Sequence, residues 1–90
     1  MNKTRRKTLD EAVALLEDAK AKVEQAKEIM ESCRDEEQEC YDNMGENLQQ
    51  SERAQKFEEN VQEMDLAIDE CDTITDSIDT AVGCLGTASE

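Results

Sequence analysis

The sequence predicts an all-α fold, an antiparallel two-helix coiled-coil hairpin, and two observations carry this prediction. Apolar residues recur at alternating steps of three and four over two long segments, which is the a/d pattern of a heptad repeat. The 90 residues include no proline and only three glycines, a composition that suits long uninterrupted helices. With one Tyr, one Phe and no Trp, the chain has little material for a globular core.

The first helix is predicted over 9–42, after a basic arm over 1–7 that we expect to be flexible. Thr8 followed by Glu11 matches a capping box at the start of this helix. The residues at the a and d positions of this helix form its seam. They alternate between large and small, which predicts a close approach of the partner helix. The large set is Leu9, Leu16, Val23, Met30 and Met44, and the small set is Ala12, Ala19, Ala26, Cys33 and Cys40. Glu37 interrupts the seam, either in a layer open to water or as a buried residue that fixes register.

A hinge is predicted over 43–50, where Asn43 and Gly45 can adopt the left-handed conformation that closes a helix. The second helix is predicted over 52–82, capped by Ser51 and terminated by Gly83, so that the hairpin spans 8–83 and 84–90 form a frayed tail. Its seam continues the heptad pattern with one weak member, Thr75. The seam consists of Ala54, Phe57, Val61, Met64, Ile68, Cys71, Thr75, Ile78, Val82 and Leu85.

The two edges of the predicted hairpin differ in chemistry. In antiparallel coiled coils the e positions of the two helices face one another, and here their charges are opposite. Basic residues on the first helix (Lys20, Lys27, Arg34) are predicted to face acidic ones on the second (Glu58, Asp65, Asp72, Asp79). The other edge is apolar and consists of Leu15, Ile29, Ala67, Ile74 and Ala81. A single hairpin would leave this edge in water, so we expect homodimerisation into a four-helix bundle, with higher oligomers as the alternative.

The net charge of −14 favours a basic protein partner and disfavours direct DNA or RNA binding and anionic membranes, although such charge can also serve solubility alone. Everything from residue 8 onward carries six basic and 24 acidic residues, a net charge of −18. The candidate partner-binding residues are the outward acids Asp69, Asp76, Glu59 and Glu63. The basic arm has two alternative roles: it could bind nucleic acid or fold against the acidic face of a neighbouring subunit.

The remaining chemistry is sparse. The sequence has no histidine to act as a base near neutral pH and no glycine-rich phosphate loop, so an enzyme is not expected. Four cysteines without a CxxC pair predict no zinc site, and helical spacing of the aspartates predicts no calcium site. We therefore expect no cofactor and no metal. No segment approaches the length and apolarity of a membrane-spanning helix or a signal peptide, which predicts a cytoplasmic protein.

The middle of the chain resembles a group of short acidic helical proteins encoded by bacteriophages and prophages of Gram-positive bacteria. The segments that carry the resemblance are 34–39 (RDEEQE), 41–44 (YDNM), 46–49 (ENLQ) and 51–53 (SER). The resemblance implies a phage setting and no established activity. Two functional hypotheses follow from the charge and the seams: an acidic inhibitor that mimics nucleic acid and occupies a basic host or defence protein, or a structural or adaptor coiled-coil oligomerisation module.

Overall fold

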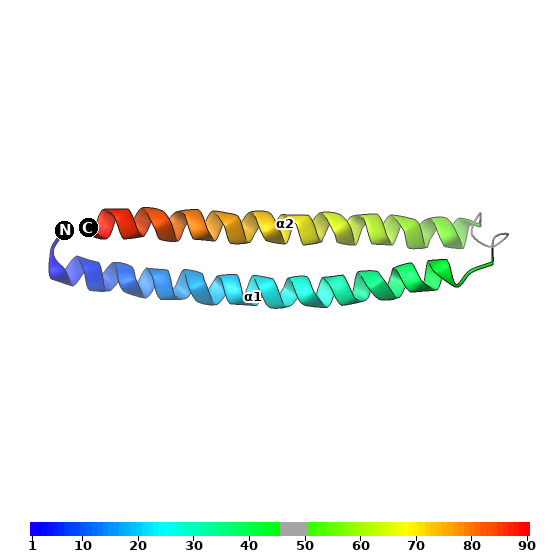
Figure 1. Ribbon diagram of the computed structural model, residues 1–90, viewed down its shortest axis with the longest axis horizontal. Coiled ribbons are helices and arrows are strands. Elements are labelled where there is room, and N and C mark those ends of the chain that lie inside the picture. The colour runs from blue at the N-terminus through cyan, green and yellow to red at the C-terminus, as the bar shows by residue number, and fades with distance from the viewer. Residues whose placement is uncertain (46–50) are drawn as a thin grey trace. The chain divides into compact units, whose positions relative to one another are not determined.

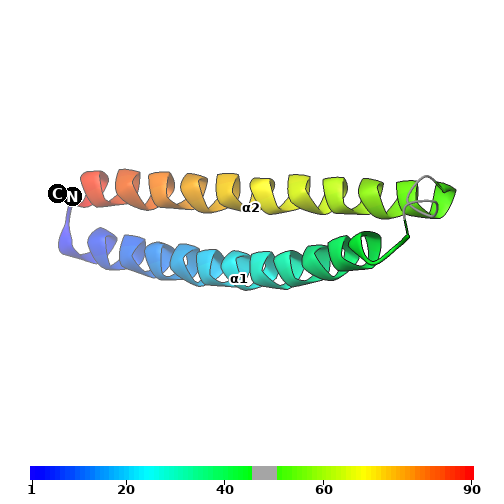
Figure 2. The same cartoon turned by 45° about the vertical axis from the view of Figure 1, so that its right-hand side comes forward.

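The structure is a computed structural model that describes residues 1–45 and 51–90. Two helices make up most of the chain: α1 (Lys3–Asp42, 40 residues) and α2 (Glu52–Ser89, 38 residues). They run antiparallel and side by side (Figures 1 and 2). The described residues contain no strand. The predicted all-α helical hairpin is therefore confirmed.

The chain divides into two compact units. The terminal unit comprises Met1–Gln25 with Cys71–Glu90, and the loop unit comprises Ala26–Glu70. Each unit pairs one half of α1 with one half of α2. Both chain termini belong to the terminal unit, where Arg6 Nη2 donates a hydrogen bond to the backbone carbonyl of Glu90 at 3.5 Å. Among the described residues only Ala54, Ile68 and Cys71 are buried hydrophobic side chains, so the core is thin.

Helix α1 begins earlier than the sequence pattern predicts. Its N-cap is Asn2, whose Oδ1 accepts a hydrogen bond from the backbone N–H of Arg5 at 2.8 Å. The predicted capping box at Thr8 is wrong, because the Thr8 hydroxyl donates instead to the carbonyl of Thr4 at 3.2 Å within the helix. Arg and Lys are good helix formers, so a cap at Asn2 is enough to extend the helix. The predicted arm over 1–7 and the predicted start at 9 are thus corrected to a helix from Lys3.

Helix α2 begins as predicted and ends later. The Ser51 hydroxyl accepts a hydrogen bond from the backbone N–H of Ala54 at 3.2 Å, which confirms the predicted cap. The helix then passes through Gly83 and reaches Ser89, so the predicted terminator and the predicted frayed tail over 84–90 are wrong. Leu85, half-buried in the terminal unit, continues the packed face beyond Gly83. Packing therefore outweighs the low helix propensity of glycine.

Helix α1 ends at Asp42, as predicted. A turn follows, in which the backbone N–H of Met44 bonds to the carbonyl of Tyr41 at 3.1 Å. Neither Asn43 nor Gly45 has a positive φ, so the predicted left-handed closure is wrong. The rest of the predicted hinge, residues 46–50, lies outside the described residues.

The two seams differ in how well the heptad pattern predicts them. All ten seam residues of α2 are buried or half-buried. In the first seam the large set is half-buried, but Ala19, Cys33 and Cys40 of the small set are exposed. The side chains one position after each member of the small set are all half-buried: Val13, Lys20, Lys27, Arg34 and Tyr41. Long side chains cover more apolar surface than Ala or Cys does, so α1 is turned toward its e positions.

Candidate binding surfaces

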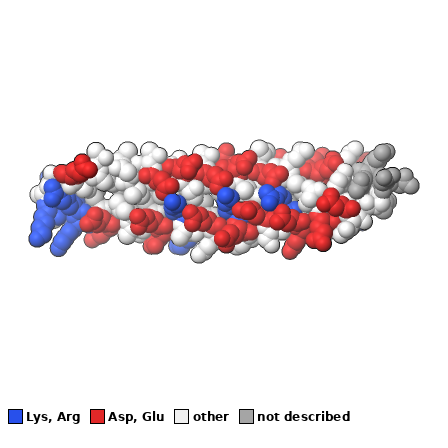
Figure 3. Space-filling view, in the orientation of Figure 1, with Lys and Arg blue, Asp and Glu red and all other residues white. Residues whose placement is uncertain are grey.

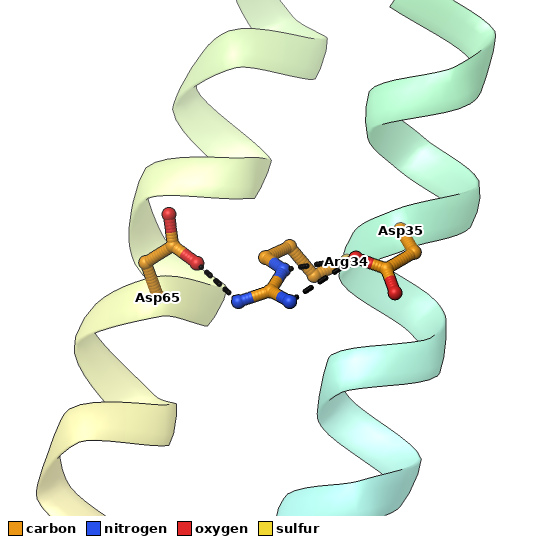
Figure 4. A network of polar contacts seen from close by, with 3 residues as sticks. All are labelled: Arg34, Asp35 and Asp65. Atoms are coloured by element: carbon orange, nitrogen blue, oxygen red, sulfur yellow. Dashed lines mark hydrogen bonds and ion pairs between the residues drawn. The ribbon is translucent and has the colours of Figure 1, made fainter.

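The charged edge is present in both units. In the terminal unit Lys20 Nζ lies 2.8 Å from Asp79 Oδ1. In the loop unit Arg34 Nη1 lies 3.0 Å from Asp65 Oδ1, and its Nη2 lies 3.1 Å from Asp35 Oδ1 (Figure 4). The residue numbers of each cross-helix pair add up to 99, which gives the register within each unit. The prediction that opposite charges meet at the e positions is confirmed for these two pairs.

Carboxylates raise the pKa of both basic groups. The hydrogen bond that Lys20 donates to Asp79 raises the pKa of Lys20 and outweighs the opposing effect of desolvation. Glu24 and Asp76 add to this rise through their charges. Hydrogen bonds to Asp65 and Asp35 raise the pKa of Arg34 in the same way. Lys20 and Arg34 therefore each lie near more than one carboxylate.

Tyr41 adds a third cross-helix pair that the charge pattern missed. It occupies the next e position after Arg34, and a hydrogen bond with the Glu58 carboxylate raises its pKa above the ordinary value of 10.0. Desolvation raises this pKa further. The pairing follows the same register as the ion pairs. Heptad position alone could have revealed it, because a phenol at e can donate to a carboxylate as an ammonium group does.

Glu37 is half-buried and accepts a hydrogen bond from Asn60 Nδ2 at 3.2 Å. It is not a buried charge, since the described residues include no buried polar or charged residue. Two open grooves of the loop unit lie nearby. One, of about 340 Å³, is lined by Gln38, Tyr41, Glu58, Val61 and Gln62. The other, of about 140 Å³, is lined by Glu37, Arg53, Lys56, Phe57 and Asn60. The first lining contains the Tyr41 hydroxyl hydrogen-bonded to the Glu58 carboxylate, and the second contains no thiol or hydroxyl.

The four predicted acidic contact residues are all exposed and are divided between the two units. Glu59, Glu63 and Asp69 belong to the loop unit, whereas Asp76 belongs to the terminal unit. Glu59 Oε2 lies 4.0 Å from Lys56 Nζ on the same helix. Asp76 helps to raise the pKa of Lys20, so it takes part in the charged edge rather than facing solvent alone. Acidic side chains nevertheless cover much of the visible face in Figure 3.

The predicted apolar edge is open in both units. In the terminal unit Leu15 is 70% exposed and Ile74 is 44% exposed, while Ala81 is half-buried. In the loop unit Ile29 is 71% exposed and Ala67 is half-buried. The structure therefore leaves the three large members of this edge in contact with water.

The small residues of α1 widen this open surface. Ala19 lies one helical turn beyond Leu15, and Cys33 lies one turn beyond Ile29. Both are exposed, because α1 turns its e positions rather than these residues toward α2. Leu66 is also exposed, at 59%, and the sequence pattern missed it. It occupies the f position of the heptad, and a single exposed apolar residue of this kind is ordinary on a protein surface.

The part of the chain that the structure describes offers neither a metal site nor a membrane-spanning helix. Within residues 1–45 and 51–90, no three His, Cys, Asp or Glu side chains are grouped closely enough to hold a metal ion. Neither described helix has a segment long and apolar enough to cross a bilayer. Comparison with protein-family models, with curated proteins and with solved structures gives no match. The resemblance to phage-encoded acidic proteins therefore stays a prediction.

Proposed function

We propose that this chain is a non-enzymatic coiled-coil oligomerisation module, whose hairpins dimerise along the apolar edge into a four-helix bundle. The observation that carries the proposal is the exposure of Leu15 (70%) and Ile29 (71%) on a hairpin with so thin a core. Full burial of each such side chain contributes about 1.5 to 3 kcal/mol. A second hairpin covering this edge supplies burial that one hairpin lacks.

The fold must order many residues around a thin core. Fixing each backbone costs about 1 to 2 kcal/mol of conformational entropy, and α1 and α2 contain 40 and 38 residues. Only three apolar side chains in the described part of the chain are buried to offset this cost. Four helices share a core that is covered on more sides than a two-helix interface. Association is therefore part of how we expect the fold to be stabilised.

The proposed module works without catalysis, cofactor or metal, and we place it in the cytoplasm of a host cell in a phage setting. The absence of histidine from the sequence supports the non-enzymatic part. The burial of Cys71 in the α2 seam supports a role for this thiol as a small apolar group in a reducing compartment. The phage setting rests on the resemblance of the middle of the chain alone.

The test is the oligomeric state in sedimentation experiments over a wide range of protein concentration. Ile29→Glu places a charge on the apolar edge and should shift the protein from dimer to monomer. Leu66→Glu is a matched control, because it makes the same kind of change on the same unit at a similarly exposed position off the edge. It should leave the dimer intact. A wild-type protein that is monomeric at every concentration would refute the proposal.

A second candidate is an acidic inhibitor that mimics nucleic acid and binds a basic host or defence protein. The observation that favours it is the charge of the loop unit, which holds four basic and fifteen acidic residues, a net charge of −11. Duplex DNA carries a charge about every 1.7 Å along its axis, so a mimic needs acidic rows from more than one helix. An oligomer would supply these rows.

Charge-neutral variants separate the two candidates. Asp69→Asn with Asp76→Asn should weaken binding to a basic DNA-binding domain strongly and leave dimerisation unchanged. The measurement is competition with duplex DNA for that domain at several salt concentrations, since screened charge pairs weaken as salt rises. Unchanged binding in the double variant would exclude these two residues as the inhibitory contact.

A further inference from the structure

A group of basic side chains lies at the start of α1, where the helix dipole disfavours positive charge. This basic cluster consists of Lys3, Arg5, Arg6 and Lys7, all exposed on the first turns of the helix. Arg6 reaches the Glu90 carbonyl, whereas Lys3, Arg5 and Lys7 have no ion pair within the described part of the chain. Blue side chains gather at this end of the molecule in Figure 3.

The position of the cluster is unfavourable for the isolated chain. The N-terminus of a helix carries a partial positive charge that favours acidic side chains. Helix α2 follows this rule with Glu52 in its first turn, whereas α1 has no acidic residue there. Breaks in local rules of this kind are expected at functional sites. The basic cluster is therefore a candidate binding surface for an anionic partner.

The distribution of charge between the units indicates which partner fits. The terminal unit holds six basic and nine acidic residues, a net charge of −3, against −11 for the loop unit. Nucleic acid phosphates would meet the cluster but would be repelled by a protein of net charge −14. A second copy offers the cluster a loop unit of strongly opposite charge. The same copy also covers the apolar edge.

We propose that two copies pair side by side in antiparallel orientation, with the basic cluster of each copy against the loop unit of the other. This inference rests on the proposed dimerisation, because the apolar edge supplies the main contact. A two-fold axis makes both contacts equivalent. In a parallel dimer two loop units of charge −11 would instead lie side by side. Charge thus selects the orientation, whereas apolar burial supplies the affinity.

The apolar edge defines a register for this pairing. When Leu15 of one α1 packs against Ile29 of the second copy, residues 3–7 come level with residues 37–41 of that copy. This segment includes Glu37 and Glu39, with Asp35, Glu36 and Asp42 beside it. Lys22 comes near the two-fold axis, where its long side chain can turn its charge to solvent.

The orientation is measured by the distance between spin labels on a protein whose only cysteine is Cys40, which is exposed on α1. Cys33 and Cys84 are changed to Ser, and the buried Cys71 is changed to Ala. The proposed register places the two Cys40 labels roughly 50 Å apart along the helix axis at 1.5 Å per residue. A parallel dimer would place them side by side, and that short distance would overturn the inference while leaving dimerisation intact.

Two triple variants with equal charge test the cluster itself. Lys3→Gln, Arg5→Gln and Lys7→Gln should weaken the dimer about tenfold at low salt and reduce its salt dependence. Ser77→Glu, Thr80→Glu and Thr87→Glu change the net charge by the same amount at exposed positions of the terminal unit outside the cluster, and they should weaken the dimer less than about threefold. Equal effects would overturn the role of the cluster. A monomeric wild type would refute the proposed function and this inference together.

Discussion

The hairpin provides partners for the side chains of its charged edge but not for those of its apolar edge. On the charged edge Lys20 and Arg34 find carboxylates across the helix pair at 2.8 and 3.0 Å. On the apolar edge Leu15, Ile29 and Ile74 remain exposed to water. The difference arises because two helices can pair charges but cannot enclose an apolar side chain on every side. A charge needs one partner group at short range, whereas burial of an apolar side chain needs neighbours on several sides.

The largest expected effect comes from comparing two isoleucines of α2, one in the seam and one on the apolar edge. Ile68 is 6% exposed and Ile74 is 44% exposed. Ile68→Ala should lower the free energy of unfolding by about 2 to 4 kcal/mol, because it leaves a cavity in a thin core. Ile74→Ala should cost less than about 1 kcal/mol in dilute solution. Urea unfolding of both variants measures the difference.

The same pair of variants shows whether a second copy covers the apolar edge. Apparent stability rises with protein concentration when folding is linked to association. The cost of Ile74→Ala should therefore grow as the concentration is raised, while the cost of Ile68→Ala is large at every concentration. An Ile74→Ala cost that stays constant over the dimerisation range would contradict coverage of the edge at this position.

The next effect concerns the C-terminal turns of α2, where Gly86 occupies the e position that follows Asp79 on the charged edge. A Cβ atom at Gly86 or Gly83 would meet nothing within 4 Å. Gly86→Ala should therefore raise the free energy of unfolding by about 0.5 to 1 kcal/mol, since alanine is the better helix former. Ala88→Gly is the mirror change and should lower it. Thermal unfolding that responds to neither would show that this part of the helix contributes little.

Much of the fold follows from the sequence because heptad spacing and charge sign act over short distances. The α2 seam and the pairs Lys20–Asp79 and Arg34–Asp65 follow from position in the repeat, and the cap at Ser51 follows from the preference of serine for the N-cap position. Such features depend on residues one or two turns apart, or directly across one interface. The apolar edge was predictable for the same reason, because it consists of apolar residues at heptad positions beside the seam.

The features that the sequence did not predict depend on competition between alternatives. Cys33 and Cys40 fit the α1 seam by spacing, but the longer Arg34 and Tyr41 cover more of the interface, and the helix turns toward them. Thr8 fits a capping box, but the earlier cap at Asn2 extends the helix past it. Gly83 fits a terminator, but packing of Leu85 continues the helix. In each case the local pattern is present in the sequence, but a more favourable contact elsewhere determines the structure.

The smallest effect tests the neutral member of the charged edge, Tyr41. This tyrosine is the only one in the sequence, so tyrosinate absorbance reports its ionisation alone. The hydrogen bond to Glu58 raises its pKa, and its titration midpoint should therefore lie above the ordinary 10.0. Glu58→Gln removes the negative charge and should bring the midpoint back toward that value. Glu59→Gln removes an equal charge one residue away and should leave the midpoint unchanged.

The raised pKa also fixes the direction of the pH dependence of folding. A group that holds its proton more tightly in the folded state stabilises the fold below its unfolded pKa and loses that effect as pH rises through the folded value. Tyr41 and Lys20 both have raised values, so stability should fall above about pH 10. Tyr41→Phe should reduce this fall, as measured by urea unfolding between neutral and alkaline pH. An equal response of the midpoint to Glu58→Gln and Glu59→Gln would mean that the overall negative charge, and not the pair across the two helices, holds the proton on Tyr41.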